Sequence, residues 1–565
     1  MSYTIRSSGP GHLHASFGSW GRLALMAVAL AFALTIVGTA PVHAQSYQDL
    51  HDFSCATGCS PDNYGPLRLG KDGYLYGTTT AGGTNNLGTI FKILPAGTGY
   101  TVLWNFDGTP TGSGPSAGLT LAVDGNFYGT AFEGGSGNAG TLFSFNPKTS
   151  VVTVLHNFVK GDGGYPEVPP IEGKDFNLYG TTDDGAIYRF TLSTKTFSLL
   201  SPPGTIADGQ GGPMFLASNG FMYGTTYHGG ASGLGTIFGM NTLGKPVVIH
   251  QFTGTDGASA VGTLVEGKDG NLYGTTLYGG PVSNSGSVFK ILPKAPFTLS
   301  TVVGFDVLSG GINVDGANPA PGLTTINGTF YGATSAGGAN GFGTLFEIQA
   351  GTFFKFYDFT GNVGTIWGNN ATSDLFANTD GLLYGITNSG GANGVGVLYS
   401  LTPPNPMPNV TLCCNWWVIL DQPVIVLGNN LTGVIGVSFG SVAAQFQPGS
   451  ATYLTAEVPS GAIDAPITVT LATGGQLQSE QTVHILPKIT NLDPTSGPVG
   501  TQVGIVGGGF AGATKVEFGG AAATTFNVTT PGLIQAIVPS GAKTGRVTVV
   551  TPNGNAVSNQ VFTVN

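Results

Sequence analysis

The chain is poor in charge. Only 8% of its 565 residues are Asp, Glu, Lys or Arg, against about 25% in an average soluble protein. Lys and Arg number 19 and are spread thinly, and the formal net charge is −10. A nucleic-acid-binding surface needs clustered cations, so a nucleic-acid partner is disfavoured. The 41% hydrophobic content also excludes a chain kept disordered by charge.

Long apolar runs are scarce as well. One run, from Leu23 to Ala40, approaches the length of about 20 residues that spans a membrane. Arg6 and Arg22 precede it, and Val42-His43-Ala44 follows as a small-x-small cleavage pattern. We expect residues 1–44 to be a secretory signal peptide, with an uncleaved anchor as the alternative. The mature chain is then secreted or on the outer cell surface, with no transmembrane segment.

Glycine, in contrast, is abundant, and it marks an internal repeat. The chain has 94 glycines, and a Tyr-Gly pair recurs at intervals of about 50 residues. The tyrosines are Tyr76, Tyr128, Tyr179, Tyr223, Tyr273, Tyr331 and Tyr384. Each unit reads as four short strands, and turns such as Asp72-Gly73 favour type I′ geometry. Four strands in such a period are typical of a propeller blade.

The two ends of the repeat region complement each other. A fourth-strand segment such as Thr101–Phe106 is missing after the seventh unit, yet a copy of it, Asp49–Phe53, opens the mature chain. The first and last segments would therefore complete one blade and leave no free sheet edge. We predict an all-β chain with a seven-bladed β-propeller over residues 45–404.

The repeat resembles a known bacterial sequence family. The pattern in Asp72–Phe91 and Asp269–Phe289 is similar to the Gloeo/Verruco (GloVer) tandem repeat. That resemblance implies an exported, surface-attached protein and carries no established activity. The third unit departs from the pattern, because its loop is Asp183-Asp184-Gly185 without a Gly-Gly pair.

A different organisation follows the proline-rich linker Pro403–Pro408. Residues 488–565 alternate short strands with glycine turns, as in a small β-sandwich. Their opening segment, Lys488–Gly497, resembles an IPT/TIG immunoglobulin-like domain. Residues 405–487 resemble a degenerate second copy, in which Trp416-Trp417 are core residues or, alternatively, a sugar-stacking platform. The resemblance implies a spacer, attachment or binding role.

Only four cysteines are present. In an oxidising compartment a local Cys55–Cys59 disulfide is expected. The alternative is pairing with the adjacent Cys413 and Cys414, which would clamp the propeller to the first sandwich. Zincin, P-loop and EF-hand motifs are missing from the sequence, so we assign no metal, cofactor or catalytic residue.

The loops between second and third strands share one rim of a propeller with the loops between blades. Most blades place small residues there, but some place carboxylates or aromatic rings. The candidate binding residues are Glu133, Asp183, Asp184, Tyr227, His228 and Tyr278. Acids facing aromatic rings could bind a sugar or a cation.

These observations favour a secreted or cell-surface binding protein whose propeller rim recognises a carbohydrate or another envelope component. The IPT/TIG domains would act as spacer or attachment. One alternative is an extracellular polysaccharide lyase or hydrolase that uses the rim carboxylates, which would have to lie about 5 to 9.5 Å apart in a hydrolase. A second alternative is a structural envelope protein.

Overall fold

The computed structural model describes residues 46–61, 67–116, 118–204, 211–260, 262–361, 369–371, 374–403, 406 and 408–565. The signal peptide predicted for residues 1–44 and part of the Pro403–Pro408 linker lie outside the described residues. The described chain consists of strands and turns with one 3-10 turn, η1 (Leu431–Gly433). The all-β prediction is confirmed.

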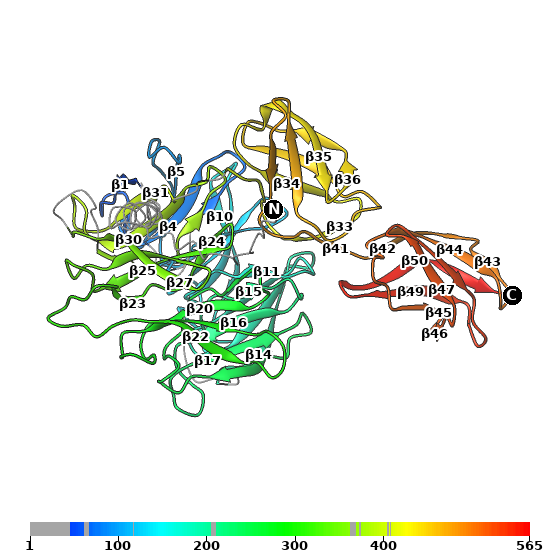
Figure 1. Ribbon diagram of the computed structural model, residues 1–565, viewed down its shortest axis with the longest axis horizontal. Coiled ribbons are helices and arrows are strands. Elements are labelled where there is room, and N and C mark those ends of the chain that lie inside the picture. Colours follow the sequence, from blue (N-terminus) through cyan, green and yellow to red (C-terminus); the bar gives the residue numbers. More distant parts are fainter. Residues whose placement is uncertain are drawn as a thin grey trace, which may run out of the picture. The chain divides into compact units, whose positions relative to one another are not determined.

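The repeat region forms small antiparallel sheets of four or five strands, the architecture of a propeller (Figure 1). We number them sheets 1 to 7 in the order of the repeat units. Sheet 1 has β3 (Arg68–Leu69), β4 (Leu75–Ala81), β5 (Thr89–Ile93), β6 (Thr101–Asn105) and the added β2 (Cys59–Pro61); sheet 2 has β7 (Thr120–Leu121), β8 (Phe127–Ala131), β9 (Thr141–Asn146) and β10 (Val151–Asn157); sheet 3 has β11 (Ile171–Glu172), β12 (Leu178–Thr181), β13 (Ile187–Thr191) and β14 (Thr196–Ser201).

The remaining sheets continue in the same way. Sheet 4 has β15 (Phe215–Leu216), β16 (Met222–Thr226), β17 (Thr236–Met240) and β18 (Val247–Gln251); sheet 5 has β19 (Val265–Glu266), β20 (Leu272–Thr276), β21 (Ser287–Ile291) and β22 (Leu299–Gly304); sheet 6 has β23 (Ala317–Pro319), β24 (Thr324–Ile326), β25 (Thr329–Ala336), β26 (Thr344–Gln349) and β27 (Thr352–Asp358); sheet 7 has β28 (Asn369–Ala371), β29 (Phe376–Ala377), β30 (Leu383–Ser389), β31 (Val397–Leu401) and β1 (Tyr47–Asp52). The added strands β2, β23 and β28 were not expected from the sequence.

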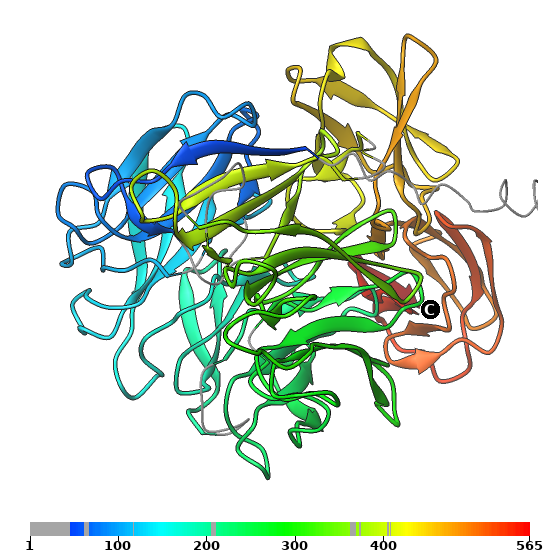
Figure 2. The same cartoon turned by 60° about the vertical axis from the view of Figure 1, so that its left-hand side comes forward.

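The predicted closure by the first segment is confirmed. Strand β1 pairs antiparallel with β31 in sheet 7, and Figure 2 shows β1 in dark blue beside the yellow-green strands of that sheet. Phe53, which follows β1, has no exposed surface and meets Phe91 of sheet 1 edge to face, with ring centroids 5.5 Å apart. The N-terminal segment therefore joins sheet 7 to sheet 1.

The same aromatic contact recurs between neighbouring sheets. A phenylalanine at the end of one fourth strand packs edge to face on the third-strand ring of the next sheet. The pairs are Phe106–Phe143, Phe158–Tyr188, Phe252–Phe289, Phe305–Phe346 and Phe359–Tyr399, with centroids 5.3 to 5.8 Å apart. The repeat thus encodes the joint between units as well as the units themselves.

The turn between first and second strands explains the spacing of Asp and Tyr in the repeat. Each turn aspartate accepts a hydrogen bond from the tyrosine hydroxyl four residues later. The pairs are Tyr76–Asp72, Tyr128–Asp124, Tyr179–Asp175, Tyr273–Asp269 and Tyr384–Asp380, at 2.6 to 3.0 Å. Each of these hydroxyls is thus held beside the carboxylate that accepts its hydrogen bond.

The predicted type I′ geometry is wrong for the Asp-Gly turns. Gly73 has a φ of 79° and donates its amide to Gly70, whose own amide bonds to Tyr74 across the turn. This is a three-residue loop with a glycine bulge, in which Asp72 keeps a negative φ. The two-residue type I′ form is found at Asn327-Gly328, where both φ angles are positive.

We expect Tyr128→Phe to lower the free energy of unfolding by about 1 kcal/mol, because it removes the 2.6 Å hydrogen bond to Asp124. The control is Tyr74→Phe, at a half-buried ring outside this set of pairs. Urea titration of both variants checks the prediction. Equal effects of the two substitutions would contradict it.

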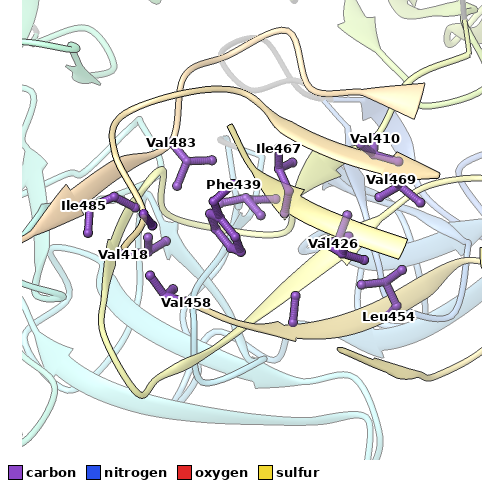
Figure 3. Close-up of a cluster of buried hydrophobic side chains, with 14 of the residues drawn as sticks. Val410, Val418, Val426, Phe439, Leu454, Val458, Ile467, Val469, Val483 and Ile485 are labelled. Carbon is purple, nitrogen blue, oxygen red and sulfur yellow. The ribbon is translucent and has the colours of Figure 1, made fainter. Parts of the chain in front are cut away.

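Two β-sandwiches follow the repeat region. The first pairs the sheet β32 (Thr411–Leu412), β34 (Pro423–Leu427), β38 (Tyr453–Glu457) and β37 (Phe446–Pro448) with the sheet β36 (Val442–Ala444), β35 (Val434–Phe439), β39 (Ile467–Leu471) and β40 (Gln476–Gln478), and β33 (Trp417–Ile419) runs parallel to β41 (His484–Leu486). Its core holds Phe439 among valines, leucines and isoleucines (Figure 3). This buried cluster gives the sandwich a hydrophobic core of its own.

The second sandwich repeats this strand order. One sheet contains β42 (Lys488–Asp493), β44 (Gln502–Gly508), β48 (Leu533–Ile537) and β47 (Phe526–Thr530), and the other β43 (Ser496–Gly497), β50 (Gly554–Val564), β49 (Gly545–Thr551), β45 (Lys515–Phe518) and β46 (Ala521–Ala522). Buried Phe510, Phe518 and Phe562 belong to its core. The two sandwiches therefore share one strand order.

The first sandwich contacts the turns between first and second strands of the repeat sheets. Thr452 Oγ1 donates to Lys71 O at 2.7 Å, and Asn415 Nδ2 donates to Gly173 O at 2.7 Å. On a third turn, Gly328 N donates to Glu480 Oε1 at 3.2 Å. Since strands alternate in direction, these turns all lie on one face of the sheets, which we call the capped face.

Candidate binding site on the open face

The loops between second and third strands lie on the opposite face, which we call the open face. In most units these loops carry the Gly-Gly pair, and Gly82 shows why glycine is required. Its φ is 79°, and a Cβ atom there would lie 2.8 Å from both Cys55 O and Cys59 N. The third unit instead makes a tight turn, in which Gly185 N donates to Thr182 O. The short turn carries Asp183 and Asp184.

Asp183 is the centre of a charged group on this face. Burial, followed by the Asp184 carboxylate, raises the pKa of Asp183, whereas His228 on the next sheet lowers it. Glu167, in the segment between sheets 2 and 3, has its pKa raised to about 7 by burial and by the Asp183 charge. The Asp183 carboxylate therefore interacts electrostatically with Glu167 and with His228 of the next sheet.

Aromatic rings continue the group toward sheet 5. The Tyr227 and His228 rings meet edge to face with centroids 4.4 Å apart. Tyr227 also shares a side-chain hydrogen bond with Tyr278, whose side chain is 39% exposed. We call Glu167, Asp183, Tyr227, His228 and Tyr278 the open-face cluster. It brings carboxyl, imidazole and phenol groups from neighbouring units together.

Two predicted residues have different roles. Asp184 Oδ1 accepts the Thr182 hydroxyl at 2.7 Å, so this carboxylate holds the tight turn and acts on the cluster through its charge. Glu133 bonds to Ser113 through its main-chain N and O, and its side chain is exposed. Among the described residues, neither a hydrogen bond nor an ion pair joins the Glu133 side chain to the cluster.

Glu167 was missed by sequence reasoning. It stands between sheets 2 and 3, in a segment whose length and sequence vary from unit to unit, so no repeat position identifies it. The sequence offered one signal for it: Glu167 is an acidic residue in a segment between units, and such segments share a rim with the loop that carries Asp183. Its main-chain oxygen accepts a hydrogen bond from Ser116 Oγ at 3.4 Å, which helps to fix the segment.

The cysteines form two local disulfides, Cys55–Cys59 and Cys413–Cys414. The first lies beside the glycine loop of sheet 1, and the second belongs to the first sandwich. Within the described ranges, no group of three or more His, Cys, Asp or Glu side chains could hold a metal ion. In the same ranges no helix has the length and hydropathy to cross a membrane.

Comparison with known proteins matches family models to the repeat region and to the second sandwich. A family model described as Gloeobacter/Verrucomicrobia repeat matches residues 35–186 and 182–399, and the IPT/TIG domain model matches residues 487–564. No match was found among curated proteins.

Solved structures show weak likenesses. A fungal alcohol oxidase in complex with copper is 14% identical, covering 75% of this chain and 98% of its own, with a TM-score of 0.45. An oligogalacturonate lyase from Vibrio parahaemolyticus is 11% identical, covering 63% and 93%, with a TM-score of 0.42. PorZ, a surface component of the type-IX secretion system of Porphyromonas gingivalis, is 15% identical, covering 75% and 60%, with a TM-score of 0.39. At these scores the likenesses carry no information about the function of this chain.

Proposed function

Because the chain belongs to the Gloeobacter/Verrucomicrobia repeat family, we propose that it is a secreted or cell-surface binding protein whose open-face cluster recognises a carbohydrate of the cell envelope or its surroundings. The observation that carries the proposal is the junction of Asp183, His228 and Tyr278 from three adjacent sheets. Carboxylates and phenols exchange hydrogen bonds with sugar hydroxyls, and exposed aromatic rings cover the apolar faces of sugars.

The placement of the first sandwich supports the choice of face. Its hydrogen bonds to Lys71, Gly173 and Gly328 occupy the capped face, so they leave the open face to a ligand. In this proposal the two sandwiches act as spacer or attachment. Residues 1–44 would direct export and then be removed.

A hydrolase or lyase acting at the same cluster is the second candidate. Glu167, with its pKa near 7, stands beside the Asp183 charge. Acid–base cleavage of polysaccharides uses a pair of carboxyl groups, of which the one with the raised pKa donates the proton. An experiment that measures product release therefore has to decide between binding and turnover.

Retention of the full chain on a panel of immobilised polysaccharides tests the proposal. We expect Asp183→Asn and Tyr278→Ala each to weaken retention at least about tenfold, since each removes a central polar or aromatic contact. The exposed Glu133→Gln serves as the matched control and should bind as the parent does. Retention that is unchanged in both cluster variants would contradict recognition at this face.

Product release decides between the two candidates. We expect retained polysaccharide to stay intact, as judged by reducing ends and by unsaturated uronate absorbance. Release that disappears in Glu167→Gln would instead establish the enzyme. Failure of every polysaccharide to bind would contradict the carbohydrate proposal and leave the structural envelope role.

A further inference from the structure

A cavity of about 390 Å³ lies where the inner strands of the repeat sheets meet the first sandwich. The inner strands are the strands that precede each Asp-Gly or equivalent turn, namely β3, β7, β11, β15, β19, β24 and β29, and each of them contributes to the wall. Residues 409–417 of the sandwich cover the cavity. We call it the capped cavity. Its volume falls within the range of small-molecule binding sites. It is separate from the open-face cluster, because it opens toward the capped face.

The wall carries four ionisable side chains, Arg68, Glu172, Asp374 and Glu480. Protein amides already hold two of them, because Val123 N donates to Glu172 and Gly328 N donates to Glu480. Arg68 of β3 pairs with Tyr76, and the residues in the same register elsewhere are uncharged: Thr120, Ile171, Phe215, Val265, Thr324 and Phe376. Asp374 precedes β29 by two residues, where the adjacent sheet 6 has Gly322. A Cβ atom on Gly322 would collide with the Asp374 carboxylate. The sequence thus makes room for the Asp374 carboxyl at this cavity.

Arg68 and Asp374 are coupled to each other and to the wall. Asp374 is 8% exposed and shares a side-chain hydrogen bond with Thr263, and the Arg68 charge acts on it. Arg68 and Asp374 both line the cavity and their charges interact, so together they offer hydrogen-bond donors and acceptors to a ligand. A free anion or cation would have to compete with the opposite member of the pair, which favours a neutral ligand.

Two further polar side chains line the cavity without a protein partner. Thr379 is 2% exposed, and its hydroxyl has no hydrogen bond within the described residues. Asn409 Oδ1 likewise accepts no hydrogen bond within the described residues. The main-chain N–H of Asn409 donates to Thr379 O at 3.1 Å. Buried hydroxyl and amide groups are rarely left unsatisfied. They offer a ligand one donor and two acceptors.

Aromatic side chains line part of the wall. Phe215, Phe376 and Trp416 line the cavity beside the Cys413–Cys414 disulfide. A second hollow of about 460 Å³ shares Phe215 and Trp416 with it and continues past the turn at Gly267–Gly270 and His484. A ligand longer than the cavity can therefore extend along this hollow.

We propose that the capped cavity binds the end of a neutral glycan, one or two sugar units long, through Arg68, Asp374 and Thr379 and against Phe215 and Trp416. Hydrogen-bond donors and acceptors together with aromatic rings match the two kinds of surface that a sugar ring presents. This inference does not rest on the proposed function of the open face.

The test is calorimetric titration of the full chain with neutral mono- and disaccharides: glucose, galactose, mannose, xylose, cellobiose and maltose. We expect at least one to bind. Thr379→Val, which keeps the side-chain volume, should weaken it at least about fivefold, and the double variant Arg68→Met/Asp374→Asn at least about tenfold. A thermal unfolding curve of each variant checks that the fold is kept. If the double variant does not fold, the binding measured for Thr379→Val decides the test.

Asp183→Asn separates this site from the open face. It should leave the binding of these small sugars unchanged, even where it weakens retention on polysaccharide. Binding that Asp183→Asn weakens and Thr379→Val leaves unchanged would overturn the assignment of the sugar to the capped cavity. Absence of binding by every sugar in the panel would also overturn it.

Discussion

Replacing Phe53 by alanine is expected to lower the free energy of unfolding by about 3–5 kcal/mol. The side chain has no exposed surface and packs against Phe91 of sheet 1, while its main chain is held by sheet 7. Its amide donates to Gly396 O at 3.1 Å, and its carbonyl accepts Asn393 Nδ2 at 2.9 Å. The substitution therefore leaves a cavity at the joint that closes the propeller.

Guanidinium titration, with hydrogen exchange to locate the effect, checks this result. We expect exchange to accelerate first in β1, β31 and β5, because these strands meet at the joint. The control is Phe221→Ala, at a side chain 43% exposed. A loss no larger than that of the control, or faster exchange confined to the sandwiches, would show that the joint contributes little to stability.

A second large effect is expected from pH. Burial is the main cause that raises the pKa of Glu172 to about 8, with the Asp124 and Asp175 charges adding to it and the hydrogen bond from Val123 N opposing it. A carboxyl whose pKa is raised by folding stabilises the protein fully below its unfolded pKa, and this stabilisation is lost as pH rises through the folded pKa. The free energy of unfolding should therefore fall between about pH 4.5 and pH 8.

For Glu172 this decrease should amount to a few kcal/mol, because each tenfold change in proton affinity on folding corresponds to about 1.4 kcal/mol. Glu172→Gln keeps the shape and an acceptor for the Val123 amide but does not ionise, so it should remove much of the decrease. Glu167 contributes in the same direction, since its pKa is raised to about 7. Urea titrations at pH 5, 6.5 and 8 measure the slope, with the exposed Glu133→Gln as the control. An identical slope in Glu172→Gln and the parent would contradict the assignment.

The repeat explains why so much of the fold could be predicted from the sequence. Seven Tyr-Gly pairs mark the second strands, and the orphan Asp49–Phe53 segment predicts the pairing of β1 with β31. Strands β2, β23 and β28 were not predicted, because they lie between units where the sequence does not repeat. The Asp-Gly dipeptide likewise could not reveal the loop length, which depends on the strand register and the bond from tyrosine to aspartate.

The candidate site was predictable only where it follows the repeat. Asp183, Tyr227 and Tyr278 occupy the same loop on successive units, so proximity follows from their register. Glu167 has no such register. The capped cavity needs a contact between Asn415 and Gly173, which are 242 residues apart and belong to different domains, and no local pattern encodes that docking.

The joint between β1 and β31 also bears on when the chain can fold during its synthesis. Asp52 accepts a hydrogen bond from Ala392 N, 340 residues later in the chain. Strand β1 therefore cannot pair with sheet 7 until the last repeat unit has been synthesised. Contacts this distant in sequence form slowly, because a large loop must close first. A nascent chain therefore stays open until the last repeat has been synthesised, and β1 can pair with β31 only then.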